Sequence, residues 1–462
     1  MKKKTVFECI ECGQQTPKWN GQCPGCGNWN TMEEREIIKG KSGNKVQLMH
    51  KTKEARKLKD VIDGRSDRII TGISEFNRVI GGGIVKDSML IITSPPGGGK
   101  STLSLEIAND AAQQGYRVLY ASGEESESQI KSRANRILSE IDANLWILSD
   151  NSMENVIGQI EKINAELVVV DSIQTFAFEA LESRPGSPTQ TMECSSVLQK
   201  MAKNSDQNRA VILIGQMTKE DELAGLRALE HLVDTVLIID SDKGEELRGV
   251  YCSKNRFGST GEMGFFAMTE QGMVSIDNPS EYFMTMRSTE EKVSGSALTV
   301  VKEGTRPVIV EVESLVSQTF MPYPSRIGEC LRKEQLNTLL SILEQRASMP
   351  LHDKNVVIKT TGGFKLREAA VNLAVIMSTV SSILDQGIPN DTAFIADVGL
   401  TGELKRIPSM ESRIRELDRM GFKKVYVAPE SVSKSIITEK IDIIEKKTLI
   451  SVIRHVFTAH GK

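Results

Sequence analysis

The stretch that decides the fold reads Met89-Leu-Ile-Ile-Thr-Ser-Pro-Pro-Gly-Gly-Gly-Lys-Ser-Thr102. Its apolar beginning predicts a buried strand, and the pattern from Leu103 to Gln113 predicts a helix. The glycine-rich loop between them lets backbone N–H groups approach phosphate oxygens, and the start of the helix adds the positive end of its dipole. The sequence therefore predicts a phosphate-binding loop.

The side chains of this loop predict a site for ATP and Mg²⁺. Lys100 is expected to reach the β- and γ-phosphates, and the Ser101 hydroxyl is expected to ligate Mg²⁺. Ser94 stands where such loops usually begin with glycine, which leaves a weakened nucleotide affinity open. The predicted nucleotide-binding residues are Ser94, Gly97, Gly98, Gly99, Lys100, Ser101 and Thr102.

Further short apolar runs predict strands that lie beside this loop. They are Arg117-Val-Leu-Tyr120, Leu167-Val-Val-Val-Asp171 and Ala210-Val-Ile-Leu-Ile-Gly215, with helical patterns between them. Continuous apolar strands that alternate with helices are typical of an α/β domain with a largely parallel sheet. In such sheets, ligands bind at the carboxyl ends of the strands.

Acidic side chains follow two of these strands. Asp171 ends one strand and is expected to hold Mg²⁺ directly or through water. Glu124 and Glu125 follow another strand. We expect Glu124 to position the attacking water, with Glu125 as the alternative.

Near the start of the chain, Cys9, Cys12, Cys23 and Cys26 form two C-x-x-C pairs separated by ten residues. Two such turns can aim four thiolates at one Zn²⁺, which leaves no open coordination position, so the zinc is expected to be structural. A segment this short has almost no core, and metal binding would supply most of its folding free energy. Redox-active thiols remain the alternative.

The composition of the chain limits how it can bind nucleic acid and indicates the cellular compartment in which it works. The chain has 61 acidic and 58 basic residues and a formal net charge of -3, so any nucleic-acid site must be a local patch. No apolar run is long enough to span a bilayer, and the beginning lacks the apolar region of a signal peptide. We expect a cytoplasmic protein without membrane contact.

The 462 residues are too many for one ordinary core, and the pattern changes along the chain indicate four segments. They are a four-cysteine zinc finger (1–30), a basic linker without strand or helix periodicity (31–65), the phosphate-loop domain (66–277) and a C-terminal α+β domain (278–462). In the last segment we expect paired strands at 296–316, helices at 334–346 and 366–384, and a strand at 355–360.

Several motifs together resemble a known family. Thr71-Gly-Ile-Ser-Glu-Phe-Asn-Arg-Val-Ile-Gly-Gly-Gly83, Ser122-Gly-Glu-Glu-Ser126 and Val170-Asp-Ser-Ile-Gln-Thr175 are similar to motifs of RecA-superfamily ATPases. With the four cysteines and Lys254-Asn-Arg-Phe-Gly258, the whole chain resembles the bacterial RadA/Sms recombination and repair proteins. The resemblance implies an ATPase that works on single-stranded or branched DNA with a RecA-type recombinase.

The resemblance also implies roles for residues that the pattern alone does not single out. Lys254 and Arg256 would stabilise the γ-phosphate of a neighbouring subunit, which implies a homo-oligomeric ring, expected to be a hexamer. Gln216 would sense the γ-phosphate, where relatives often have histidine, because an amide can also bond phosphate. The stretch after it, with Lys219 and Arg227, would be a DNA-binding loop or a plain surface loop.

The C-terminal segment resembles the catalytic domain of Lon proteases, particularly at Asp397-Val-Gly-Leu-Thr-Gly-Glu-Leu-Lys-Arg-Ile407. Such proteases pair a serine nucleophile with a lysine base. Here Ala370 replaces the serine and Arg413 the lysine, and a guanidinium cannot act as a base. We therefore expect an inactive protease fold, with Lys365, Arg367, Lys405 and Arg406 as candidate DNA contacts.

Two functions of different classes follow. The first is a DNA-dependent ATPase of homologous recombination and DNA repair, a ring-shaped helicase that promotes branch migration. The second is a nucleotide-switched module that binds DNA or a recombinase without unwinding. An ATP-dependent protease is disfavoured because both dyad residues are replaced.

Overall fold

A computed structural model describes residues 3–9, 14–16, 18–19, 21–27, 32–38, 57, 59, 68–204, 207–216, 225–240, 246–285, 287, 292–433, 436 and 438–457. The chain divides into two units, Met1–Asp63 and Gly64–Lys462. Each unit is described by itself.

The N-terminal unit is a small antiparallel sheet. Among its described residues, β1 (Lys3–Cys9) lies between β2 (Gln15–Thr16) and β3 (Met32–Ile38), and Cys9 is the partner of Met32. The prediction of a linker without strands in 31–65 is therefore wrong at its beginning, because Met32–Ile38 pairs with β1 along its whole length. The first cysteine pair therefore begins at the end of a hydrogen-bonded strand.

The second unit begins with the phosphate-loop body, the name used here for the elements from β4 to β14. Its described strands form one sheet in the order β14-β13-β12-β11-β6-β10-β9-β7-β8. The strands from β11 to β8 are parallel, and β12, β13 and β14 extend the sheet in antiparallel fashion. This confirms the predicted α/β fold with a largely parallel sheet. The bounds are β6 (Met89–Ser94), β7 (Val118–Ser122), β8 (Leu145–Ser149), β9 (Leu167–Asp171), β10 (Ala210–Gln216), β11 (Thr235–Asp240), β12 (Leu247–Asn255), β13 (Met263–Thr269) and β14 (Gly272–Ser275), beside the small pair β4 (Arg68–Ile69) and β5 (Ile84–Val85).

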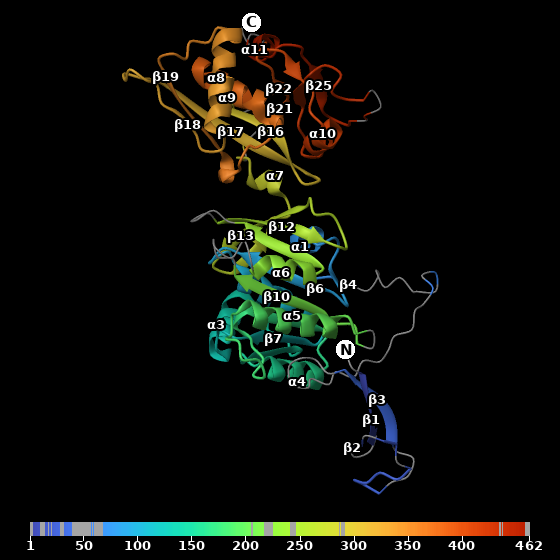
Figure 1. Cartoon of the computed structure of the whole chain (residues 1–462). Helices are drawn as coiled ribbons and strands as arrows, with labels where there is room; N and C mark the ends of the chain where they lie inside the picture. Colours follow the sequence, from blue (N-terminus) through green and yellow to red (C-terminus); the bar gives the residue numbers. More distant parts are fainter. Residues whose placement is uncertain are drawn as a thin grey trace. The chain divides into compact units, whose positions relative to one another are not determined.

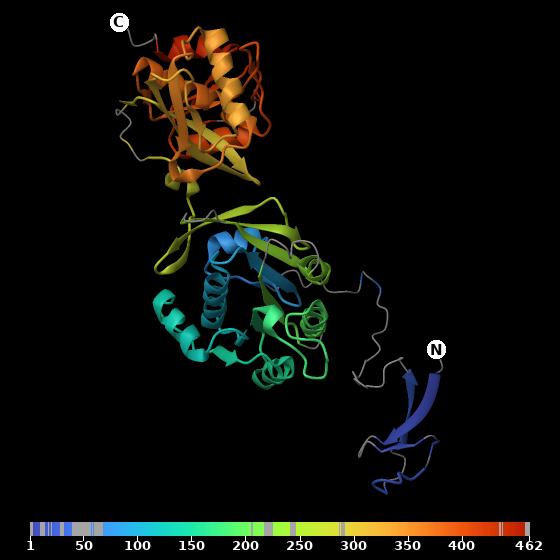
Figure 2. The ribbon, with the colours of Figure 1, turned by 60° about the vertical axis from the view of Figure 1, so that its left-hand side comes forward.

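Helices cover both faces of this sheet (Figure 2). One apolar core joins the sheet to α1 (Ser74–Val79), α2 (Lys100–Gln113) and α3 (Glu127–Ile137). A second core joins it to α4 (Met153–Ile163), α5 (Pro188–Ala202) and α6 (Gly225–Leu232). Burial on both faces explains why the central strands read as continuous apolar runs.

The C-terminal body, which comprises the elements from β15 to α11, has its own mixed sheet. The described strands follow the order β18-β19-β17-β16-β21-β24-β25. Helices α8 (Lys333–Ala347), α9 (Asn372–Leu384) and α11 (Leu449–Phe457) share one core with it, and α10 (Met410–Arg419) shares another. The strand bounds are β16 (Ser296–Glu303), β17 (Arg306–Gln318), β18 (Arg326–Gly328), β19 (Lys354–Thr360), β21 (Thr392–Ile395), β24 (Lys424–Val427) and β25 (Asp442–Glu445), with the short pairs β15 (Lys292–Val293) with β20 (Ile388–Pro389) and β22 (Asp397–Val398) with β23 (Leu404–Lys405). Across all described residues, no helix combines the length and apolar character that a membrane span requires.

One predicted element begins later than the sequence indicates. The helix expected from Leu366 begins at Asn372, after a single turn of 3-10 helix at Ala369–Val371. Glu368 is extended, and its carboxylate accepts hydrogen bonds from the Lys302 backbone and from Arg413. These tertiary bonds hold the segment out of the helix.

Helix α7 (Pro279–Tyr282), labelled in Figure 1, follows β14 in the chain and precedes the C-terminal body. A buried acid of the phosphate-loop body contacts the C-terminal body. Glu75 of α1 is 3% exposed. Its Oε1 lies 2.7 Å from a guanidinium nitrogen of Arg306, at the start of β17, and its Oε2 accepts a hydrogen bond from the Phe265 backbone. Phe265 and Phe283 pack edge to face beside it. The Glu75 carboxylate thus pairs both with Arg78 of its own helix, at 3.0 Å, and with a cation of the other body.

Candidate nucleotide-binding and hydrolysis site

The phosphate loop joins the end of β6 to the start of α2. Gly97 and Gly99 have φ values of 79° and 100°, which suit glycine alone among common residues. A Cβ atom at Gly98 would lie 2.4 Å from the Ser94 hydroxyl. No side chain caps the first turn of α2 at its N-cap residue, Gly99, which leaves backbone N–H groups there for an anion.

Ser94 has a defined contact that glycine could not make. The Lys100 ammonium donates to both the carbonyl oxygen and the hydroxyl oxygen of Ser94, each at 3.1 Å. Burial lowers the pKa of Lys100, while Asp171 and Glu124 act in the opposite direction. Serine in place of glycine therefore gives the Lys100 ammonium a second oxygen atom with which to form a hydrogen bond.

Asp171 ends β9, two strands from β6, and is 8% exposed. Its Oδ2 accepts a hydrogen bond of 2.6 Å from the Tyr120 hydroxyl. Burial and the neighbouring carboxylate raise the pKa of Tyr120, so the phenol stays protonated and keeps donating. The hydrogen bond from Tyr120 fixes the orientation of the Asp171 carboxylate, and such a supporting bond is typical of a side chain that ligates a cation.

Glu124 and Gln216 come together, although 92 residues separate them. The Gln216 amide donates to both carboxylate oxygens of Glu124, at 3.0 and 3.3 Å, and the Ser172 hydroxyl donates to the same carboxylate. Glu125 instead pairs with Arg133 of α3. Of the two neighbouring acids, Glu124 alone contacts Gln216 within the described residues.

Three residues beside the loop escaped the reasoning from sequence. A pocket is lined by the loop residues Gly97 to Thr102 together with Arg133, Arg136 and Met268. Arg133 and Arg136 lie three positions apart on α3, which puts both on one helix face. The sequence could therefore have indicated that these two arginines share a surface of the helix. Met268 comes from the β13–β14 hairpin, and nothing local indicated it.

Lys254 and Arg256 lie at the opposite edge of the sheet. Lys254 lies near the end of β12, and Arg256 directly follows that strand. Asn255 at this end pairs with Thr235, and Thr235 pairs with Leu90 near the beginning of β6. The phosphate loop follows the other end of β6. The structure therefore does not bring these two cations to the phosphate loop of their own chain.

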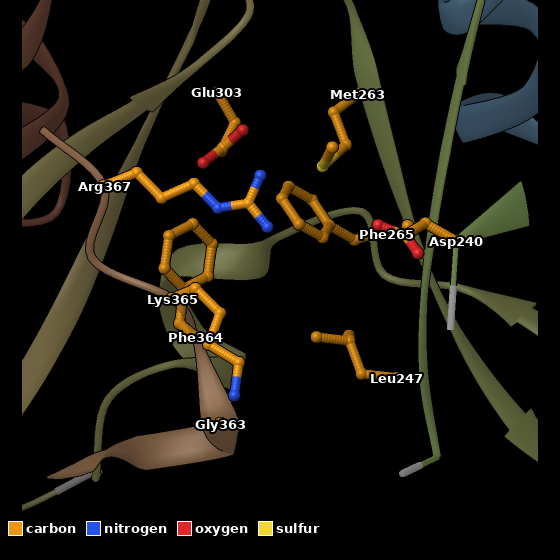
Figure 3. A pocket seen from close by; sticks show the side chains of 10 residues that line it. Asp240, Leu247, Met263, Phe265, Glu303, Gly363, Phe364, Lys365 and Arg367 are labelled. Carbon is orange, nitrogen blue, oxygen red and sulfur yellow. The ribbon is translucent and has the colours of Figure 1, made fainter. Parts of the chain in front are cut away.

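The candidate DNA contacts do not form one cluster among the described residues. Lys219 lies outside the described residues, and Arg227 belongs to α6, where its side chain is not described. Lys365 and Arg367 line a pocket between the two bodies, and Figure 3 shows the Arg367 guanidinium directed into it beside Glu303. Lys405 and Arg406 are exposed at β23, with Arg406 3.6 Å from Glu430.

The cysteines are placed only in part, because Cys12 lies outside the described residues. Cys9 ends β1, and Cys26 is exposed. Cys23 is 1% exposed, and its sulfur accepts a hydrogen bond of 3.3 Å from the Gly25 backbone. A buried sulfur that faces a backbone N–H suits a thiolate that ligates Zn²⁺, so the described part of the turn fits a structural zinc site.

Ala370 and Arg413, which stand where the resemblance to Lon proteases predicts the serine and the lysine, are both buried. The guanidinium of Arg413 donates to both oxygens of Glu368, at 2.7 and 2.6 Å, and to the Val300 carbonyl. The nearby hydroxyls bond inside the body: Ser378 to Ser314, Ser381 to the Gln386 carbonyl, and Ser382 accepts from the Val316 backbone.

Comparisons with known proteins extend this description. The model of an AAA domain matches residues 52–222, and the model of a rubredoxin metal binding domain matches residues 7–34. The DNA repair protein RadA of Bacillus subtilis (strain 168) is 40% identical over 429 residues, which cover 92% of this chain and 93% of that protein. The RadA of Streptococcus pyogenes serotype M3 (strain MGAS315) is 38% identical and covers 99% of this chain and 100% of its own length. The chain belongs to the RadA family of DNA repair proteins.

Membership of the RadA family confirms the resemblance seen in the motifs, and the domain matches support a RecA-like ATPase core preceded by a zinc ribbon. Among solved structures, a KaiC-like protein from Pyrococcus horikoshii OT3 has a TM-score of 0.38 and 21% identity, covering 45% of this chain and 98% of its own. The RadB recombinase has a TM-score of 0.36 and 22% identity, covering 45% of this chain and 100% of its own.

Proposed function

We propose that this chain is a DNA-dependent ATPase of recombinational DNA repair, which assembles into a hexameric ring and drives helicase or branch-migration activity. The observation that carries the proposal is the division of the catalytic groups between two edges of one sheet. Lys100, Asp171, Glu124 and Gln216 lie at one edge, and Arg256 lies at the other, with about half of its side chain exposed. A second copy of the chain would complete the site.

In the proposed reaction, the phosphate loop binds ATP. The first-turn N–H groups of α2 and the Lys100 ammonium hold the phosphates, and Ser101 and Asp171 hold Mg²⁺. Bound Mg²⁺ would neutralise charge that develops on the phosphate oxygens. Tyr120 keeps the Asp171 carboxylate in place through its hydrogen bond.

Glu124 is proposed to orient the attacking water. Its carboxylate is held by Gln216 and Ser172 at the sheet edge, and Gln216 lies at the end of β10, directly before the stretch that contains Lys219. Gln216 can thus report the state of the γ-phosphate to the proposed DNA loop with Lys219 and Arg227. The ion pair of Glu125 with Arg133 favours Glu124 for this role.

The remaining segments are proposed to support work on DNA. Residues 1–38, which include β3, are a structural zinc finger, 39–65 a linker, 66–277 the RecA-like ATPase and 278–462 a Lon-like domain without protease activity. Glu368 neutralises Arg413, and Ala370 carries no nucleophile, which supports the loss of proteolysis. We propose that Lys365, Arg367, Lys405 and Arg406 contact DNA in the cytoplasm, with a RecA-type recombinase as partner.

The test measures ATP turnover with and without single-stranded DNA, the sedimentation of the same sample, and strand displacement. The proposal expects DNA-stimulated turnover, a ring-sized species and unwinding, and Glu124→Gln is expected to lower kcat by about a hundredfold or more. Glu127→Gln, an exposed acid on the same helix entry, serves as the matched control. DNA binding with no unwinding would favour the nucleotide-switched module instead.

A further inference from the structure

A buried carboxylate lies directly behind Arg256. Asp234, just before β11, is 2% exposed. Its Oδ1 accepts a hydrogen bond of 3.0 Å from an Arg256 guanidinium nitrogen, and its backbone carbonyl accepts one from the Arg256 N–H at 3.1 Å. Both the backbone and the side chain of Arg256 therefore donate hydrogen bonds to Asp234.

Asp234 is itself fixed in the sheet. Its Oδ2 accepts from the Met89 N–H at 3.1 Å, and its own N–H donates to the Met89 carbonyl at 2.8 Å. Met89 is the first residue of β6, the strand that ends at the phosphate loop. A buried carboxylate with such fixed partners cannot turn away, so it can set the direction of a guanidinium.

The Arg256 side chain is held but not covered. It is 52% exposed, whereas the Asp234 side chain is 3% exposed. A guanidinium has five N–H donors, and the bond to Asp234 uses one of them. The others remain able to meet an anion that a neighbouring subunit presents.

Lys254 is arranged differently. Its ammonium donates to the carbonyl oxygens of Glu230 and Val233, at the carboxyl end of α6. A cation there stabilises the helix end. Of the two basic residues of the motif, Lys254 is engaged with its own helix, and Arg256 is presented outward.

We propose that Asp234 is the positioning residue for Arg256, and that its carboxylate aims the guanidinium at the γ-phosphate of the adjacent subunit. This inference rests on the proposed function, in which Arg256 acts on a neighbour. Asp234 does not touch the nucleotide. It acts only through Arg256.

The experiment compares full-length Asp234→Asn, Arg256→Ala and the double variant by DNA-stimulated ATP turnover. Asparagine keeps an oxygen for the Met89 N–H but removes the charge that holds Arg256. We expect Asp234→Asn to lower kcat about tenfold with KM within about twofold of wild type, because nucleotide binding lies at the other edge. The double variant should turn over no more slowly than Arg256→Ala, since Asp234 has nothing else to position.

Lys203 provides a second test and a control that leave the buried carboxylate in place. Its ammonium also lies 3.0 Å from Asp234 Oδ1, and its side chain is 41% exposed. Lys203→Met should keep wild-type kcat, whereas Lys203→Glu adds a rival carboxylate for Arg256 and should lower kcat several-fold. If a thermal melt shows that Asp234→Asn is unfolded, the comparison of Lys203→Met with Lys203→Glu tests the positioning role of Asp234 instead.

Three results would overturn the inference, two from the Asp234 variants and one from the Lys203 variants. One is wild-type kcat in a folded Asp234→Asn protein, and the other is a double variant whose loss equals the product of the two single losses. Equal turnover of Lys203→Met and Lys203→Glu would also contradict it. Absence of DNA-stimulated turnover in the wild-type protein would instead refute the proposed function.

Discussion

Each of the two large bodies holds a helical cation, partly buried in the first and fully buried in the second, and the two cations are held in opposite ways. In the phosphate-loop body, the Lys100 ammonium donates to two neutral oxygens of Ser94. In the C-terminal body, the Arg413 guanidinium donates to both oxygens of the Glu368 carboxylate. A cation whose hydrogen-bond partners are neutral can exchange them for a phosphate and leave no unpaired charge. A cation that forms an ion pair with a carboxylate cannot leave it without leaving that carboxylate unpaired. The difference separates a binding group from a structural one.

The largest expected effect comes from removing the binding cation. Lys100→Ala should reduce ATP turnover by about a thousandfold or more, because the β- and γ-phosphates lose their charged partner. The free energy of unfolding should change little, because the partners that Lys100 leaves behind are the neutral oxygens of Ser94 and not a charged group. Steady-state hydrolysis and a denaturant titration on the same protein measure the two quantities. Turnover near wild type would show that Lys100 is not the binding group.

Removal of the structural cation should give the reverse pattern. Arg413→Met leaves the Glu368 carboxylate without its partner and should lower the free energy of unfolding by about 3 kcal/mol. The kcat of the protein that remains folded should stay at the wild-type level. Arg415→Met removes an exposed arginine of the same helix and is the matched control. If Arg413→Met were as stable as Arg415→Met, the proposed contrast between the two cations would be wrong.

The same contrast explains what could be predicted from sequence. The strand, the glycine loop and the helix follow from residues adjacent in the chain, and the positions of Lys100 and Asp171 follow with them. The pairing of Arg413 with Glu368 crosses 45 residues, and the contact of Gln216 with Glu124 crosses 92. No local periodicity encodes such contacts.

Other features were missed for the same reason. The late start of α9 depends on bonds that Glu368 makes with β16 and α10, although its local pattern is helical. Asp234 reads as an ordinary acid before a strand, and its role behind Arg256 appears only once β6, β11 and β12 lie side by side. The family resemblance supplied Lys254 and Arg256, but not the residue behind Arg256.

A smaller effect should test the contact between Gln216 and Glu124. Gln216→Ala removes the amide that donates to this carboxylate and should lower kcat about tenfold, the loss of roughly 1.4 kcal/mol. Gln216→His keeps a donor nitrogen and should retain more turnover than alanine. Steady-state kinetics with DNA present measure both. Equal losses for the two variants would show that the amide donor has no special role.

Two glutamates, the partly buried Glu106 and the fully buried Glu311, extend the comparison to pH. In the phosphate-loop body, burial raises the pKa of Glu106 to about 7, although the Met273 N–H donates to its Oε1. In the C-terminal body, burial alone would raise the pKa of Glu311, but donors from Ser296, Thr285 and Arg287 together lower it. The same residue type therefore has opposite pH dependence in the two bodies.

The last predicted effect, on stability and not on turnover, is the pH dependence that Glu106 causes. Because its folded pKa of about 7 lies above the model-peptide value of 4.5, its stabilisation is complete below pH 4.5 and is lost as the pH rises through about 7. Glu106→Gln does not lose stability in this way, so its unfolding free energy should gain about 2 kcal/mol relative to wild type between pH 5 and pH 8. Glu311 has the opposite sign: its contribution is present above pH 4.5 and is lost as the pH falls, so Glu311→Gln should be least favourable near neutral pH. Denaturant titrations that extend from below pH 4.5 to pH 8, with the exposed Glu161→Gln as a reference, separate the two signs. A Glu106→Gln difference that stays constant with pH would show that the carboxylate is already ionised in the folded protein at pH 5, and that only Glu311 reports a buried charge.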